Sequence, residues 1–373
     1  MNCAFICWRP YQIFNALNLV YNDVEGTRGN SDLYIQDLPI MQDLAERIAR
    51  LGYFKNIYVF EEKNRGDGVG VTPLKMAGIY AMRTVNFIAP VRAIKKNCPE
   101  IKEFRHAYDA ILCSGWISFS MELANCNPGA KIILFEDGSG NYVNDLIENM
   151  PRVHRAYYGL LKTFFGRGPL VIKVACMYVY EPGSMSVKRK YPVKAMPKIS
   201  DGMYEVLCRV FQYDESSDIY TETSTVFLDQ PLKHIGKGYD QNRVIEYLAQ
   251  DPSFICRRHP VQKVDESLTY EDRKRPMWEL VANKFTNNTV LVSTFSTGQL
   301  TPAMIYGVYP TLVFLYRLNE PEGTDAFPRV KKFIDMFRAS YRGKIYEPRS
   351  FAEFTDVMTE IREQRQKESR IDG

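Results

Sequence analysis

Residues 131–142, KIILFEDGSGNY, contain the pattern on which the predicted fold rests. The apolar run before Glu136 predicts a short buried strand, and the acids and glycines directly after it predict a turn. In open parallel sheets, ligands bind at the carboxyl ends of the strands. Glu136 and Asp137 therefore have the position of ligand-binding or catalytic acids, although a turn with two solvated acids would produce the same short pattern.

Strand-like and helix-like segments alternate on both sides of this stretch. In the first half, strands are predicted at 3–7, 32–35, 57–60, 110–113, 132–135 and 171–180, and helices at 10–21, 41–51, 72–96 and 153–165. In the second half, strands are predicted at 226–229, 254–256, 290–292 and 311–316, and helices at 242–249, from 299 onward, and at 351–366. Alternation of this kind predicts mostly parallel sheets.

The length of 373 residues is enough for two domains of about 150–200 residues each. Residues 181–218 carry proline, lysine and serine with weak periodicity, and we interpret them as the connection. We therefore predict an α/β protein with two Rossmann-like domains that face each other across a cleft, at 1–200 and 201–348, followed by a C-terminal helix at 349–373. This is the glycosyltransferase-B layout, although a fold does not determine its chemistry.

The composition limits the class of protein and its partners. A chain with 45% hydrophobic and 25% charged residues is ordinary for a soluble protein, and its net charge is +4. Much of the excess positive charge lies in small clusters at 92–96, 188–190 and 273–275. These clusters fit anionic substrates or an anionic membrane surface, or they are solvated faces. They are too small and scattered to predict nucleic-acid binding.

The cysteines and the hydropathy pattern predict a cytoplasmic location. Eight cysteines occur without a CxxC pair, and several lie inside apolar strands, where cysteine acts as a small hydrophobic residue. This usage indicates a reducing compartment and neither a disulfide framework nor a zinc site. No apolar run approaches the ~18 residues of a membrane-spanning helix. Peripheral association with the inner face of a membrane and homodimer formation both stay open.

A second candidate motif is Arg257-Arg258-His259-Pro260, which follows an apolar strand ending at Cys256. Pro260 favours an extended or turn conformation for His259 and so predicts a side chain at a strand end. Histidine can donate a proton to a leaving group near neutral pH, and the arginines could help bind phosphate. A surface histidine in a basic turn is the alternative.

The third motif, STFSTG at 293–298, lies between a predicted strand and a predicted helix. Hydroxyls at this position cap a helix, and with free N–H groups and the positive helix end they form an anion site. Capping needs one or two hydroxyls, whereas Ser293, Thr294, Ser296 and Thr297 supply four. The motif therefore favours a bound phosphate.

The sequence contains no Asp-x-Asp motif, no GxxxxGK[ST] loop and no GxGxxG loop. We therefore expect no metal and no cofactor, so that hydroxyls, a helix dipole and histidine would stabilise a departing phosphate. Together the three turns predict a phosphate site in the second half and an acid in the first. That division suits transfer from a nucleotide-linked donor.

With these motifs the chain resembles the bacterial sialyltransferases of glycosyltransferase family 52. That family pairs an acidic turn with a His-Pro dipeptide and a Ser/Thr-rich turn, which here are 136–138, 259–260 and 293–297. The segment RPYQIFNAL at 9–17 also resembles the first strand-to-helix segment of the family.

The resemblance implies an inverting, metal-independent transfer of sialic acid from CMP-sialic acid to a galactoside-type hydroxyl of a surface glycan, as in lipooligosaccharide or capsule biosynthesis. It implies that His259 assists the departure of CMP and that the four hydroxyls contact its phosphate. Asp137 is the first candidate for the base, and Asp229 and Asp240 are the alternatives. The further residues expected to bind substrate are Glu136, Gly138, Ser139, Asn141 and Pro260.

Other functions remain compatible with these motifs. The chain could transfer another sugar from a nucleotide, or it could be a nucleotide-sugar epimerase with the same layout. It could also be a non-catalytic glycan-binding or nucleotide-binding protein. In the favoured function its partners are a nucleotide-sugar donor and a glycan acceptor.

Overall fold

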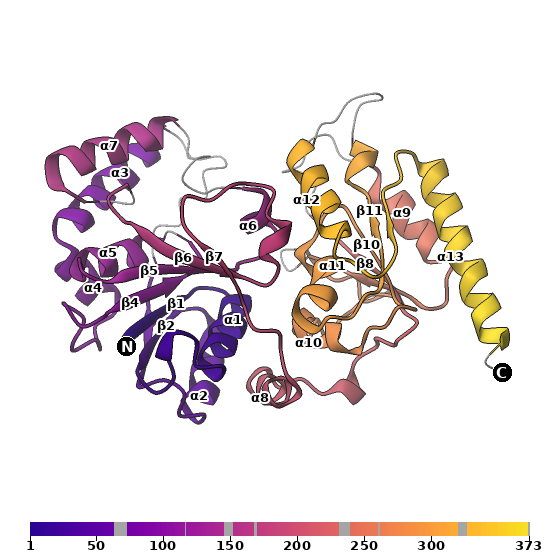
Figure 1. Cartoon of the computed structure of the whole chain (residues 1–373), viewed down its shortest axis with the longest axis horizontal. Coiled ribbons are helices and arrows are strands. Elements are labelled where there is room, and N and C mark those ends of the chain that lie inside the picture. The colour runs from indigo at the N-terminus through magenta and orange to yellow at the C-terminus, as the bar shows by residue number, and fades with distance from the viewer. Residues whose placement is uncertain are drawn as a thin grey trace. The chain divides into compact units, whose positions relative to one another are not determined.

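The computed structural model describes residues 1–62, 73–115, 117–144, 152–167, 170–230, 239–259, 262–319 and 327–371. The chain forms two compact units. Unit 1 comprises Met1–Pro182 and Lys188–Pro197, and unit 2 comprises Gly183–Val187 and Lys198–Gly373. Each unit contains one parallel sheet flanked by helices (Figure 1). The predicted pair of Rossmann-like α/β domains is therefore confirmed.

Unit 1 is built on a sheet of seven parallel strands in the order β3-β2-β1-β4-β5-β6-β7. The strands are β1 (Cys3–Cys7), β2 (Ser31–Gln36), β3 (Asn56–Phe60), β4 (Ala110–Cys113), β5 (Lys131–Phe135), β6 (Val174–Val179) and β7 (Val193–Ala195). The central strands are apolar throughout because helices cover both faces of the sheet. Strand order reverses between β1 and β4, which makes this pair the topological switch point.

The helices of unit 1 largely follow the predicted pattern. They are α1 (Pro10–Tyr21), α2 (Pro39–Ala49), α3 (Pro73–Ile88), α4 (Pro90–Asn97), α5 (Ser118–Cys126), α6 (Gly140–Val143) and α7 (Arg152–Phe165). The single helix predicted at 72–96 is wrong, since α3 ends before Pro90 and α4 begins there. Proline lacks the N–H group that would continue the hydrogen-bond ladder, and it is well tolerated in a first turn.

The predicted connection at 181–218 contains regular structure that its weak periodicity did not reveal. β7 pairs with β6 as an edge strand of unit 1, and it is too short and too exposed to show a pattern. α8 (Asp201–Phe211) belongs to unit 2 and is capped by the hydroxyl of Ser200. Its buried residues recur at helical spacing and could have been found in the sequence; they are Met203, Val206, Leu207 and Val210.

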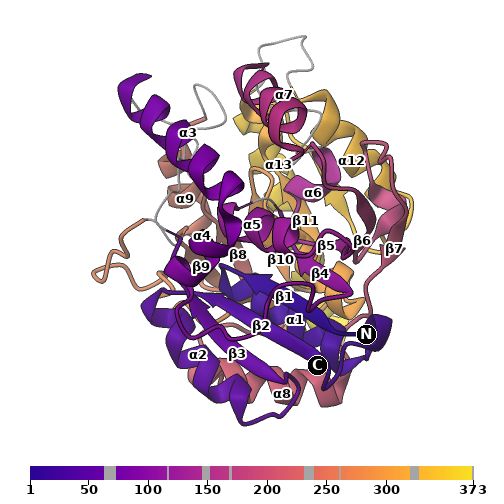
Figure 2. The same cartoon turned by 90° about the vertical axis from the view of Figure 1, so that its left-hand side faces the viewer.

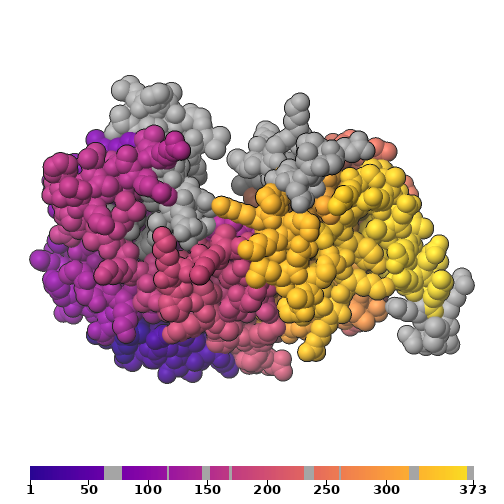
Figure 3. All heavy atoms as spheres, turned by 45° about the horizontal axis from the view of Figure 1, so that its top comes forward, coloured from indigo at the N-terminus to yellow at the C-terminus, as the bar shows by residue number. Residues whose placement is uncertain are grey.

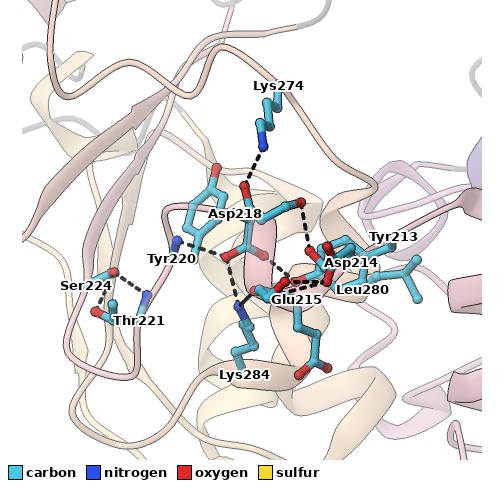
Figure 4. A network of polar contacts seen from close by, with 12 residues as sticks. Tyr213, Asp214, Glu215, Asp218, Tyr220, Thr221, Ser224, Lys274, Leu280 and Lys284 are labelled. Carbon is cyan, nitrogen blue, oxygen red and sulfur yellow. Dashed lines mark hydrogen bonds and ion pairs between the residues drawn. The ribbon is translucent and has the colours of Figure 1, made fainter.

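A polar network fixes the segment after α8 to the rest of unit 2 (Figure 4). The ammonium group of Lys284 donates to the carbonyl of Glu215 at 2.6 Å and to the buried carboxylate of Asp218 at 2.8 Å. That carboxylate also accepts hydrogen bonds from the hydroxyl of Tyr213 and from the N–H of Tyr220. A buried carboxylate with this many partners orders the chain that enters the second sheet.

Unit 2 is built on five parallel strands in the order β12-β11-β10-β8-β9. The strands are β8 (Thr225–Leu228), β9 (Phe254–Arg257), β10 (Val290–Ser293), β11 (Thr311–Phe314) and β12 (Ile345–Tyr346). β9 is added on one side of β8, and β10, β11 and β12 are added in turn on the other side. The switch point of this sheet therefore lies between β8 and β10.

The helices of unit 2 are α8, α9 (Gln241–Leu248), α10 (Trp278–Val281), α11 (Thr297–Thr301), α12 (Pro328–Arg338) and α13 (Phe351–Ile371). α13 runs along the surface of the unit (yellow in Figure 3). It packs Phe354, Met358 and Ile361 into the core cluster around Phe227 and Val292. Throughout the described ranges, every helix is too short or too polar to span a bilayer.

Candidate functional site

The acidic turn of unit 1 begins with Glu136, directly after β5. Its side chain is 1% exposed. One carboxylate oxygen accepts a hydrogen bond from the hydroxyl of Tyr11 at 3.0 Å, and the other accepts from the hydroxyl of Tyr142 and the N–H of Tyr180. Burial raises the pKa of Glu136, and these hydrogen bonds act in the opposite direction. Glu136 thus joins the end of β5 to its neighbours and has little capacity left for a ligand.

Asp137 is the next residue, and one oxygen of its carboxylate accepts a side-chain hydrogen bond. Oδ1 accepts a hydrogen bond from the side-chain amide of Gln12 at 3.0 Å, whereas Oδ2 has no hydrogen-bond donor within the described part of the chain. Burial raises the pKa of Asp137, while the Gln12 hydrogen bond and the positive charge of Arg9 lower it. A positioned carboxylate with one open oxygen and a raised pKa has the properties of a general base.

The rest of the turn holds Asp137 in place. Gly138 has a φ of 117°, in the left-handed region that favours glycine, and Ser139 precedes the short helix α6. The side chain of Asn141 is almost fully buried, and its amide oxygen accepts the N–H of Asp137 at 2.6 Å. Asn141 and Gly138 therefore fix the direction of the carboxylate.

Buried polar residues on α1 support this turn. The segment 9–17 carries part of the family resemblance, but no role for these side chains was predicted from the sequence. Gln12, Asn15 and Asn18 are fully buried and recur every third residue in an otherwise apolar helix. Asn15 donates to the carbonyl of Glu136 at 2.9 Å and accepts from the hydroxyl of Tyr180 at 2.9 Å. Buried polar groups are costly unless they are hydrogen-bonded, so this spacing was a detectable signal.

In unit 2, Gln230 joins the ends of β8 and β10 at the switch point. Its side-chain oxygen accepts from the hydroxyl of Ser293 at 3.1 Å and from the N–H of Phe295 at 2.9 Å. Its side-chain nitrogen donates to the carbonyl of Phe295 at 2.8 Å. Gln230 therefore shapes the hydroxyl-rich turn, a role that the sequence did not reveal.

The four hydroxyls of this turn fall into two pairs. Ser293 and Thr294 are 0% and 1% exposed, and the Thr294 hydroxyl lies 2.9 Å from that of Tyr239. Ser296 and Thr297 are half-buried, and Ser296 accepts the N–H of Gly298 at 3.2 Å as the N-cap of α11. The inner pair therefore shapes the turn, and the outer pair is the one accessible to a ligand.

The helix behind the turn approaches its neighbours closely. α11 runs directly into a π-helical turn at Pro302–Tyr306, which ends at Gly307 with a φ of 74°. A Cβ atom at Gly298 would lie 2.8 Å from Nε1 of Trp278 and 2.9 Å from a methyl carbon of Leu228. Glycine at this position lets the positive helix end follow β10 without a clash.

Asp229 lies directly after β8 and is 4% exposed. The guanidinium of Arg258 is 3.8 Å from its carboxylate, and Arg258 also pairs with Glu271 at 2.8 Å. No well-aligned hydrogen bond from a described residue reaches either oxygen of Asp229. Burial raises the pKa of Asp229, and Arg258 lowers it. Burial thus raises the pKa of both Asp229 and Asp137, and the side chain of Asp229 is the less exposed to solvent of the two.

Arg257, the other arginine of the basic turn, has a structural role. It pairs with the carboxylate of Asp272 at 2.6 Å, and its guanidinium lies over the ring of Trp278 at 5.3 Å. An arginine committed to a buried ion pair and a ring contact is poorly suited to bind a phosphate. Of the two arginines, Arg258 lies nearer to the candidate site.

His259 is half-buried just past the end of β9, and its carbonyl accepts the N–H of Gln262 at 2.8 Å in a turn. β8 pairs with β9 on one side and β10 on the other, so His259, Asp229 and the hydroxyl turn share one edge of the sheet. Pro260 lies outside the described residues. Asp240 is exposed and caps α9 by accepting the N–H groups of Asn242 and Arg243, which gives it a structural role.

Across the described ranges, no cluster of three or more histidine, cysteine, aspartate or glutamate side chains could hold a metal ion. Seven of the eight cysteines are buried, as expected for small hydrophobic residues.

No protein-family model and no curated protein sequence matches the chain. Among solved structures, the chain is similar to Arabidopsis thaliana UGT89C1 complexed with UDP, with 13% identity, a TM-score of 0.50, and coverage of 95% of this chain and 88% of that one. Spinosyn forosaminyltransferase SpnP has 11% identity, a TM-score of 0.48, and coverage of 95% and 87%. The S. aureus MnaA-UDP co-structure has 13% identity, a TM-score of 0.46, and coverage of 95% and 94%. At such identities the UGT89C1 similarity bears on the fold alone, and it confirms a glycosyltransferase-B type fold.

Proposed function

We propose that the protein is an inverting, metal-independent glycosyltransferase that moves sialic acid from CMP-sialic acid to a galactoside-type hydroxyl of a glycan. The observation that carries this proposal is the grouping of His259, Asp229 and the hydroxyl turn at the switch point of the unit 2 sheet. Doubly wound sheets bind nucleotides at this location. The choice of cytidine and of sialic acid rests on the family resemblance of the motifs.

Unit 2 supplies the groups that bind and release the donor phosphate. The outer hydroxyls of Ser296 and Thr297 and the N–H groups at the start of α11 would contact the phosphate. The inner pair, Ser293 and Thr294, would keep the turn in shape through Gln230 and Tyr239. His259 would donate a proton to the phosphate oxygen as the bond to the sugar breaks.

Unit 1 supplies the base in the proposed reaction. The open oxygen of Asp137 takes the proton of the acceptor hydroxyl, whose oxygen then forms the new bond to the sugar carbon. The electron pair of the broken sugar–phosphate bond stays with the phosphate of CMP. A single displacement of this kind inverts the configuration at the sugar carbon, and the products are the sialylated glycan and CMP.

A transferase that uses another nucleotide sugar is the second candidate. UGT89C1, which shares the fold, was determined with UDP bound. The unit 2 groups described above recognise a phosphate, and none of them distinguishes cytidine from uridine. A non-catalytic protein that binds a nucleotide or a glycan is the third candidate.

A thermal-shift screen with CMP, UDP, GDP and their sugar conjugates tests the donor class. We expect CMP to raise Tm, because a ligand at about 100 times its Kd stabilises the folded state by about 2.7 kcal/mol. With CMP-sialic acid and lactose, mass spectrometry should then detect sialyllactose. Stabilisation by UDP or GDP instead of CMP would identify another donor, and stabilisation by CMP-sialic acid without any turnover would identify a binding protein.

The pH dependence tests Asp137 as the base. Asp137 must be ionised to accept a proton, so kcat/KM should fall at low pH. Because burial raises the pKa of Asp137, this fall should occur at a higher pH than for an ordinary aspartate. The Gln12 hydrogen bond lowers the pKa of Asp137, so Gln12→Leu should move this acidic limb to higher pH. The measurement is a pH profile of kcat/KM for each variant.

Tyr11→Phe is the matched control for that profile. Tyr11 lies next to Gln12 in the sequence, but its hydroxyl donates to Glu136 and not to Asp137. Its acidic limb should therefore coincide with that of the wild type. An unchanged limb in Gln12→Leu would mean that the ionisation of Asp137 does not limit the rate.

A further inference from the structure

Exposed apolar side chains are concentrated in one region of unit 1. Ten large apolar side chains are exposed among the described residues, and eight of them belong to α3, α7 or the segment that follows α7. These eight are Met82, Val85, Ile88, Val153, Leu160, Phe164, Phe165 and Val171. Single exposed apolar residues are normal, whereas a concentration of this kind marks an interaction surface.

These apolar residues are not the contacts that hold the two helices together. α3 and α7 lie side by side (Figure 2), and their inner faces meet through the hydroxyls of Thr84 and Tyr157, which are 2.9 Å apart. Phe87, Tyr158 and Leu161 form a buried cluster between them. The exposed apolar side chains are therefore additional to a packed and hydrogen-bonded interface.

The exposed residues recur at helical spacing on each helix. On α7, Val153, Leu160 and Phe164 lie seven and four residues apart and form one stripe. On α3, Met82, Val85 and Ile88 lie three residues apart and share one side. Each helix thus carries a buried apolar face and an exposed one.

The charge on this region has a single sign. Residues 78–97 and 152–173 contain nine lysines and arginines and no aspartate or glutamate. Of these, Arg92, Lys95 and Lys173 are exposed and line a common pocket with the exposed side chains of Ile88 and Val171. A helix pair with exposed apolar side chains and only positive charge complements an anionic, partly apolar surface.

A pocket of about 1280 Å³ opens where the ends of these helices converge. Ile88, Phe165 and Val171, all exposed, contribute to its lining, and no acidic residue does so. Its basic lining residues are Arg92, Lys95, Arg105, Arg167 and Lys173. Ala130 and Ile132 place the pocket at the amino end of β5, whereas Asp137 follows the carboxyl end of the same strand. The pocket is therefore distinct from the candidate active site.

We propose that the exposed side of α3 and α7, with this basic pocket, docks on the surface of an anionic phospholipid bilayer. The apolar side chains enter the headgroup region, the lysines and arginines meet lipid phosphates, and the pocket receives a lipid headgroup. A second copy of the chain is a poor occupant, because the same surface would bring the exposed lysines and arginines of one copy against those of the other. The proposal does not depend on glycosyl transfer.

Sedimentation with vesicles tests this proposal. The full chain should bind vesicles of phosphatidylcholine mixed with phosphatidylglycerol, bind vesicles of phosphatidylcholine alone weakly, and lose binding as salt is raised. The double variant Arg92→Glu/Lys95→Glu should reduce the apparent partition coefficient at least about tenfold, since each basic residue near an anionic surface contributes roughly fivefold. Leu160→Ser/Phe164→Ser should also reduce it at least about tenfold through lost apolar burial.

Matched controls use equivalent changes elsewhere on the surface. Within the described ranges, Ile40 and Ile219 are the other two exposed large apolar residues, so Ile40→Ser/Ile219→Ser should bind as the wild type does. Arg50→Glu/Lys367→Glu changes the net charge equally at two exposed positions outside this surface and should also bind normally. Three results would overturn the proposal: equal binding to neutral and anionic vesicles, equal losses in the controls, or no vesicle binding by a chain that uses this surface to dimerise or to bind RNA.

Discussion

Asp137→Asn is expected to lower kcat by about 10²–10⁴, the usual contribution of a general base. The asparagine keeps the shape of the side chain, and its amide oxygen can still accept the Gln12 hydrogen bond. It cannot accept the proton of an acceptor hydroxyl. Steady-state kinetics with CMP-sialic acid and a galactoside measures the effect, and a thermal shift with CMP should show unchanged donor binding.

The same variant should be at least as stable as the wild type. Burial raises the folded-state pKa of Asp137, so its ionised form opposes folding above the pKa of the unfolded chain. At neutral pH the neutral asparagine removes that cost, and Tm should stay constant or rise. A large fall in Tm together with the loss of activity would indicate a structural carboxylate instead of a base.

Variants of Asp240 and Asp229 test whether either of these acids, and not Asp137, is the general base. Asp240→Asn should keep full activity, because Asp240 is an exposed helix cap and asparagine caps equally well. Asp229→Asn removes a buried charge 3.8 Å from Arg258, so its main effect should be on donor binding, as a higher KM. If Asp229→Asn abolished turnover and Asp137→Asn did not, the base would lie in unit 2.

The strands and the turns that follow them could be predicted from the sequence because their signals are local. The apolar runs ending near Cys113, Phe135 and Ser293 are strands within one or two residues of the predicted bounds. An apolar run bounded by turn residues is buried in a parallel sheet wherever its neighbours lie. The positions of the acidic, histidine and hydroxyl turns followed from this pattern.

The supporting side chains could not be predicted because their partners lie far away in the sequence. Gln230 contacts a turn 65 residues later, and Gln12 contacts an acid 125 residues later. Nothing near Ser293 indicates that its hydroxyl is fully buried and bonded to Gln230. Sequence reasoning therefore located the turns but could not separate the hydroxyls that shape them from those that a ligand could reach.

His259→Ala is expected to lower kcat by about 10²–10⁴ with little change in donor binding. The proposed role of His259 is to protonate the phosphate oxygen as the sugar leaves, a step that takes place in the transition state and not in the bound ground state. The loss should therefore appear in kcat and kcat/KM together, with KM unchanged. Circular dichroism and Tm should match the wild type, since His259 is half-buried in a turn beyond β9.

His259→Gln separates proton donation from hydrogen bonding. Glutamine retains a hydrogen-bond donor near the phosphate but cannot transfer a proton, so kcat should be nearly as low as in the alanine variant. If glutamine restored most of the activity, His259 would position the phosphate by a hydrogen bond, and departure of CMP would rely on the hydroxyl turn and the start of α11. Normal turnover in both variants would remove His259 from the mechanism, and the phosphate site would then depend on Ser296, Thr297 and Arg258.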